Sequence, residues 1–71
     1  MEYVNVASSN IAAVGYDEGS NTLGVRFLNG SEYHYFGVPR SIFDGLRSAG
    51  SVGRFFDEHV KKAGYSYNRI G

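Results

Sequence analysis

Hydrophobic and polar residues alternate along the segment LGVRFLNGSEYHYF, residues 23–36, which is centred on Asn29-Gly30. Alternation with a period of two is typical of β-strands, and Asn-Gly is the dipeptide most typical of a two-residue type I′ turn. This segment therefore predicts a β-hairpin. The preceding segment IAAVGYD, residues 11–17, predicts another strand, and residues 18–21 have the composition of a four-residue turn between the two.

A two-residue turn at Asn29-Gly30 sorts the hairpin into two faces, because successive side chains of a strand point to opposite sides of a sheet. One face carries mainly apolar side chains and is expected to face the core: Leu23, Val25, Phe27, Phe36, Glu32 and His34. The other face carries Tyr33 and Tyr35 beside Arg26 and Gly24. Tyrosine rings can stack on bases and a guanidinium can contact phosphate, so this second face is the predicted binding surface.

The hydrophobic period changes after residue 37 and predicts two short helices. Pro39 suits the first turn of a helix over residues 39–48, and Ser51 is a suitable N-cap for a second helix over residues 52–63. Gly64 is expected to end that helix. Helices on one side of the sheet would leave the tyrosine side open to solvent, to the tail or to a partner.

The two ends of the chain have weaker patterns. Residues 1–10 predict a short edge strand or an ordered arm. The tail, residues 65–71, alternates aromatic and polar residues and predicts either a late strand at the sheet edge or an extended segment across one face. We therefore expect residues 1–71 to form a single α+β domain, with a three- to four-stranded antiparallel meander and two short helices packed on one face.

The charge balance bears on the class of partner. Seven basic residues balance seven acidic ones, which argues against strong nonspecific duplex binding, because such binding depends on a basic excess. A local pocket for a nucleotide or a single strand remains open, since aromatic stacking supplies much of the affinity there. The chain has no cysteine, no signal-peptide pattern and no apolar run long enough for a membrane span, so a cytoplasmic protein without membrane contact is expected.

The tail supplies a second aromatic and basic cluster, formed by Tyr65, Tyr67 and Arg69. If the tail lies beside Tyr33 and Tyr35, both clusters contribute to one ligand pocket. The structural alternative is that the tyrosines simply anchor the end of the chain. Neither histidine has metal-ligand spacing, and no phosphate loop or nucleophile elbow is present. We therefore expect no catalytic residues, no metal and no cofactor.

Several segments together resemble a known family, the KTSC domain. They are SSNIAAVGYD, TLGVRFLNG, EYHYFGVP, LRSAGSVGRFFDEHVK and YSYNRI, in this order, and the resemblance covers residues 6–70. Its central mark is Tyr33-His34-Tyr35, which follows the Asn-Gly pair and precedes Val38-Pro39. That module occurs at the C-terminus of some lysyl-tRNA synthetases and in free-standing bacterial and phage proteins. The resemblance implies a free-standing form and, through the synthetases, a suggested link to RNA.

Two functional hypotheses follow. The first is a noncatalytic module that binds a nucleotide or single-stranded RNA through the aromatic and arginine surface. The alternative is a homo-oligomeric interaction protein in which the same surface is a subunit interface, enclosing a small signalling nucleotide between subunits. A small domain with an uncovered sheet face gains stability by self-association, so a homo-oligomer is expected under both.

Overall fold

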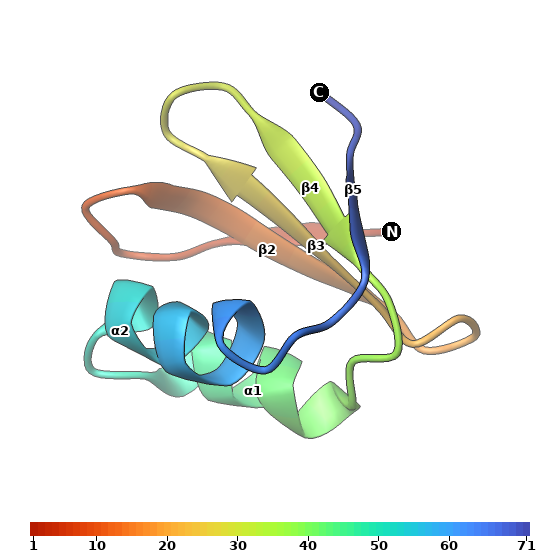
Figure 1. The fold of residues 1–71 in the computed structure, drawn as a ribbon. Coiled ribbons are helices and arrows are strands. Elements are labelled where there is room, and N and C mark those ends of the chain that lie inside the picture. Colours follow the sequence, from red (N-terminus) through yellow and green to blue (C-terminus); the bar gives the residue numbers. More distant parts are fainter.

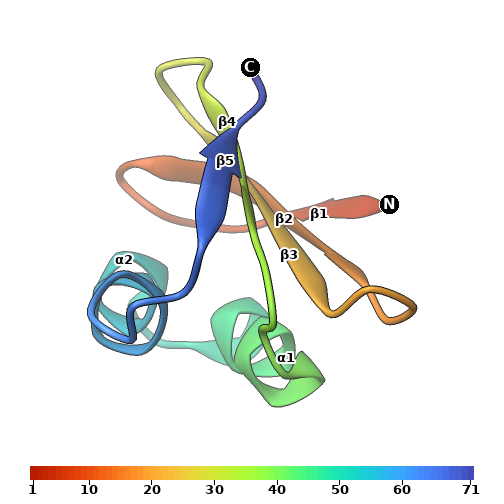
Figure 2. The same cartoon turned by 45° about the vertical axis from the view of Figure 1, so that its right-hand side comes forward.

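The computed structural model describes all residues, Met1–Gly71, as one antiparallel sheet of five strands with helices on one face (Figures 1 and 2). Strand order in space follows strand order in the chain, so the sheet is a meander. The strands are β1 (Tyr3–Asn5), β2 (Ile11–Asp17), β3 (Thr22–Phe27), β4 (Glu32–Tyr35) and β5 (Tyr67–Arg69). This confirms the predicted α+β meander. The sheet is wider than predicted because both ends of the chain join it as edge strands.

The helical layer consists of α1 (Arg40–Ser48) followed by α2 (Val52–Phe56), which continues without a break into the π-helical turn η1 (Asp57–Lys61). Ser51 caps α2, as predicted, and its hydroxyl accepts a hydrogen bond from the backbone N–H of Arg54 at 3.4 Å. Both helices lie against the same face of the sheet (Figure 2). Neither has the length and apolar character that a bilayer-spanning helix needs.

The turn η1 determines which residue pairs with Asp57. The backbone N–H of Lys62 donates to the carbonyl oxygen of Asp57 at 3.0 Å, which is the i→i+5 hydrogen bond of a π-helix. The same two residues also form an ion pair at 3.5 Å. In a regular α-helix Asp57 would face Lys61 instead; the π-turn shifts its partner by one residue, and Asp57 and Lys61 form no ion pair.

The hydrophobic core lies between the sheet and the helices. Tyr16 of β2 stacks on Phe43 of α1, with ring centroids 5.6 Å apart, and its hydroxyl donates to the carbonyl oxygen of Val38 at 2.5 Å. The largest side chains that are fully buried are Ile11, Leu23, Leu46, Val14, Val25, Val38 and Val60. Strands β2 and β3 supply four of these side chains, and Tyr35 of β4 belongs to the same core cluster.

The pairing of β2 with β3 is the predicted one. Asp17 lies opposite Thr22, and Gly15 lies opposite Gly24, as a four-residue turn requires. A bulge near Ile11 shifts the register at the far end of the pair. The first strand β1 then pairs with the outer side of β2, which confirms the edge-strand alternative for the N-terminal residues.

The pairing of β3 with β4 differs from the prediction by one residue. Leu23 lies opposite Tyr35, and Val25 lies opposite Tyr33. Paired residues share a face, so both tyrosines project from the side of the sheet that packs on the helices. Arg26 projects from the opposite side. The prediction that Arg26, Tyr33 and Tyr35 form one surface is therefore wrong.

The register differs because the loop between β3 and β4 is one residue longer than predicted. The loop contains three residues, Leu28–Gly30, because the N–H of Phe27 donates to the carbonyl oxygen of Ser31 at 2.8 Å. Gly30 has φ +93°, typical of the residue that closes a three-residue hairpin loop. Leu28 is 61% exposed in this loop, whereas Tyr35 is only 7% exposed. Burying the tyrosine side of β4 thus prevails over the local preference of Asn-Gly for a two-residue turn.

Candidate ligand-binding cleft

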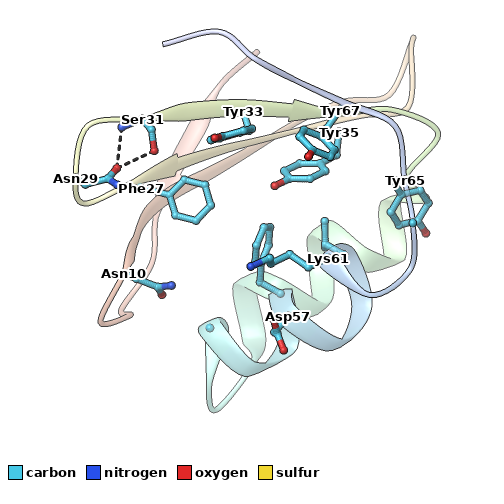
Figure 3. A pocket seen from close by; sticks show the side chains of 14 residues that line it. Asn10, Phe27, Asn29, Ser31, Tyr33, Tyr35, Asp57, Lys61, Tyr65 and Tyr67 are labelled. Atoms are coloured by element: carbon cyan, nitrogen blue, oxygen red, sulfur yellow. Dashed lines mark hydrogen bonds between the residues drawn. The ribbon is translucent and has the colours of Figure 1, made fainter.

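A cleft of about 650 Å³ opens between the sheet and the second helix (Figure 3). Strands β3, β4 and β5 supply one wall, and α2 and η1 supply the other. Its lining is half hydrophobic, with aromatic rings on the sheet wall. A volume of this size lies within the range of about 300–1,000 Å³ found for small-molecule sites.

Three tyrosines form the sheet wall. The ring centroids of Tyr33 and Tyr35 lie 6.3 Å apart, and the ring of Tyr67 lies 5.9 Å from the first and 5.5 Å from the second. We call these three residues the tyrosine wall. Adjacent strands place them side by side, because Tyr67 lies opposite Tyr35 in the β4–β5 pair. Tyr67 of the tail cluster thus lies beside Tyr33 and Tyr35, which is the arrangement on which the prediction of one shared pocket depended.

The three rings differ in how far they are exposed. Tyr35 is packed against Phe56 at 5.6 Å and belongs to the core, and burial raises the pKa of its phenol. Tyr33 is half-buried beneath Phe27, with the two rings edge to face at 5.8 Å. Tyr67 is 59% exposed. A planar ligand would therefore meet Tyr67 first, and the other two rings would support it from behind.

Tyr65 also lines the cleft, from the segment between η1 and β5. At the opposite end the lining is polar and comes from Asn10, Asn29 and Ser31. The side-chain oxygen of Asn29 accepts hydrogen bonds from the N–H of Ser31 at 3.0 Å and from its hydroxyl at 2.7 Å. The cleft therefore combines an apolar stacking wall with hydrogen-bonding groups at one end (Figure 3).

Two of the predicted site residues lie outside the cleft. The guanidinium carbon of Arg26 is 3.8 Å from the ring centroid of Tyr3, on the other face of the sheet, and its Nε contacts Glu32 at 3.2 Å. Arg69 pairs with Tyr33 in the β4–β5 register, but it is exposed and its Nε donates to the carbonyl oxygen of Gly71 at 3.0 Å. Neither arginine lines the cleft.

Lys61 and Phe27 line the cleft and were not predicted as site residues. The sequence could have identified Phe27, because it lies two residues after Val25 in the same strand and therefore shares its face, the one expected to face the core. No signal identified Lys61, since its position in the cleft depends on the π-turn.

The outer face of the sheet carries a separate polar cluster. The hydroxyl of Tyr3 donates to Oε2 of Glu32 at 2.6 Å and lies 3.4 Å from Nε2 of His34. The hydrogen bond from Tyr3 and the nearby Arg26 hold the pKa of Glu32 below its usual value. Burial and the bond to Glu32 raise the pKa of Tyr3 well above its ordinary value. His34 was predicted near Glu32 on the core face; it lies near Glu32, but on this outer face.

Comparison with known proteins finds similar proteins along almost the whole chain. The KTSC domain model matches residues 7–65. The solved structure of a KTSC domain protein from Yersinia pestis superposes with a TM-score of 0.86 at 38% identity, covering 99% of this chain and 97% of that one. An uncharacterized protein of Stutzerimonas stutzeri is 37% identical over 70 residues, which is 99% of each chain.

Two further relatives have different lengths. A protein of Tsukamurella paurometabola is 46% identical over 56 residues, which covers 79% of this chain and 84% of that protein. A lysine–tRNA ligase of Nostoc punctiforme is 38% identical over 53 residues, which covers 75% of this chain but only 9% of the ligase. The similarity to the ligase therefore concerns a small part of that enzyme.

Proposed function

This chain belongs to the KTSC domain family, and from that premise we propose that it is a noncatalytic module that binds an unpaired nucleobase, of a nucleotide or of single-stranded RNA, in the aromatic cleft. The tyrosine wall carries this proposal. Stacking of a base on an aromatic side chain contributes about 1–3 kcal/mol and tolerates any base, because every base has a π-face. Tyr67, with more than half of its surface exposed, offers such a ring beside a cleft of nucleotide size.

The charge of the chain favours stacking over phosphate contacts as the main source of affinity. Formal net charge is zero, and neither Arg26 nor Arg69 reaches the cleft. The occurrence of a similar segment in a lysine–tRNA ligase is consistent with an RNA or nucleotide ligand. The lack of cysteine is consistent with function in a reducing cytoplasm.

The decisive experiment compares Tyr67→Ala with Phe36→Ala. Both residues are exposed aromatics, but only Tyr67 lines the cleft. Isothermal titration with AMP, UMP and short oligo(A) and oligo(U) strands should show binding that Tyr67→Ala weakens by about tenfold and Phe36→Ala leaves unchanged. Circular dichroism confirms that both variants are folded. Absence of binding to every probe, or equal losses in the two variants, would refute the proposal.

A second candidate function is self-association through the outer edge of β5. This strand pairs with β4 on one side only; Tyr67 within it is 59% exposed, and Ile70, which follows it directly, is 52% exposed. Unpaired strand edges with apolar side chains favour pairing with another chain. Light scattering tests this candidate directly. A dimer that Ile70→Lys converts to monomer would support it, and a monomeric mass at high concentration would exclude it.

A further inference from the structure

We infer that the cleft is selective for a nucleotide with a single phosphate, and that Lys61 is the residue that binds this phosphate. The inference rests on the proposed function, because it assigns the second half of a ligand whose base lies on the tyrosine wall. The charges of the cleft and the turn η1 both point to Lys61.

The cleft contains only two charged side chains, Asp57 and Lys61. Asp57 is paired with Lys62 at 3.5 Å, so its charge is partly balanced by a partner on its own helix. Lys61 has no carboxylate within 4.0 Å and forms no ion pair. The cleft therefore presents one ammonium group that no carboxylate neutralises, which can contact one phosphate group, and it offers no second cation for the further phosphates of a polyphosphate.

The π-turn explains why this ammonium is available. With regular α-helical spacing, Asp57 and Lys61 would be four residues apart on one face and would pair with each other. In η1, Lys62 instead donates its backbone N–H to the carbonyl oxygen of Asp57 and forms the ion pair with its carboxylate. This arrangement leaves Lys61 in the helix wall of the cleft (Figure 3). Single π-turns of this kind are frequent at functional sites.

The two walls are then complementary to the two parts of a nucleotide. The sheet wall presents the rings of Tyr33 and Tyr67, and the helix wall presents Lys61 across the same cleft (Figure 3). A base stacked on the rings would place its sugar and phosphate toward the helix. An ammonium near a phosphate forms a charge-assisted hydrogen bond, roughly twice as strong as a neutral one.

The test compares each monophosphate with its nucleoside in the wild-type chain and in two variants. Lys61→Gln removes the proposed contact, and Arg54→Gln removes one positive charge from the same helix outside the cleft. Neither Lys61 nor Arg54 forms an ion pair, so both substitutions leave the salt bridges of the chain intact. In the wild type, AMP and UMP should bind about tenfold more tightly than adenosine and uridine, and ATP should gain nothing further.

The expected result is that Lys61→Gln abolishes the preference for the monophosphate and leaves nucleoside affinity unchanged, while Arg54→Gln keeps the preference. If nucleosides and monophosphates bind the wild type equally, or if both variants lose the preference alike, the inference is wrong although base binding stands. Tighter binding of ATP or of an oligonucleotide than of the monophosphate would also overturn it. If no nucleoside or nucleotide binds at all, the proposed function and this inference fail together.

Discussion

Tyr3 of β1 reaches across two intervening strands and donates a 2.6 Å hydrogen bond from its hydroxyl to the carboxylate of Glu32 on β4. The path is open because Gly24 has no side chain; a Cβ there would overlap the end of the Tyr3 ring. Arg26 covers the ring from above, with its guanidinium carbon 3.8 Å from the ring centroid. The short N-terminal strand is thus held to the sheet by one side chain as well as by its backbone.

Replacing Tyr3 by Phe tests this contact. The ring and its packing against Arg26 would remain, but the hydrogen bond to the carboxylate would be lost. Hydrogen bonds to charged groups contribute about 1.5–3 kcal/mol, and partial exposure places this one near the lower end. Urea denaturation should show a loss of about 1–2 kcal/mol, against less than about 0.5 kcal/mol for Tyr67→Phe, whose hydroxyl has no hydrogen-bond partner in the chain. Equal losses for the two variants would contradict the assignment.

Adding a methyl group at Gly24 should disturb the same contact from below. Gly24→Ala places a Cβ where the Tyr3 ring and the Met1 sulfur lie, so the ring must move away from Glu32. We expect a loss of about 1–3 kcal/mol, typical of overpacking. Gly50→Ala is the control, because nothing lies within 4 Å of a Cβ there. A double-mutant cycle adds a sharper criterion: Tyr3→Phe should have a smaller effect in the Gly24→Ala background, and strict additivity would show that the sites are independent.

The lowered pKa of Glu32 predicts a pH dependence of stability. The ordinary carboxyl pKa is 4.5, and in the folded chain the bond from Tyr3 and the charge of Arg26 lower it. The ionised carboxylate therefore stabilises the fold above about pH 4.5, and this contribution is lost as the pH falls through the folded pKa. Glu32→Gln should flatten the acid limb of the stability curve measured by urea denaturation between pH 3 and 6. Glu58→Gln, at an exposed residue without an ion pair, should retain the limb, and a steep limb in both variants would refute the linkage.

Deleting Leu28 tests what sets the register of the hairpin. The deletion leaves Phe27 opposite Ser31 and converts the loop to the two residues Asn29-Gly30, so the pairing of β3 with β4 can remain as it is. We expect a folded protein that is less stable by at most about 2 kcal/mol, since the N–H of Leu28 gives up one backbone hydrogen bond to Asn10. Nuclear Overhauser contacts between the α-protons of Gly24 and His34 would confirm the register. Their loss would show that the turn, rather than the burial of the tyrosines, determines the pairing.

Much of the architecture follows from local pattern. Alternation over residues 11–17 and 23–36, turn-forming residues 18–21 and the helical period after residue 38 were sufficient to predict three strands, two helices and the register of the first hairpin. These features depend on contacts between residues that are near in sequence, so composition and spacing carry the information. The same pattern left two alternatives for the tail, a pocket shared with the tyrosines of β4 or a simple anchoring of the chain end, and it did not decide between them.

The candidate site depends on two structural features that the local sequence pattern does not determine, the length of the loop between β3 and β4 and the π-turn η1. A loop of three residues instead of two moves Tyr33 and Tyr35 to the helix face and separates them from Arg26, because each strand position alternates between faces. A single π-turn makes Lys62, and not Lys61, the ion-pair partner of Asp57, and Lys61 lines the cleft without a partner. By itself, the sequence determined the elements and their order. Tertiary packing decided which face each strand presents, since the observed register places Tyr35, which is buried, and Tyr33, which is half-buried, on the helix side, where their apolar surface is removed from water.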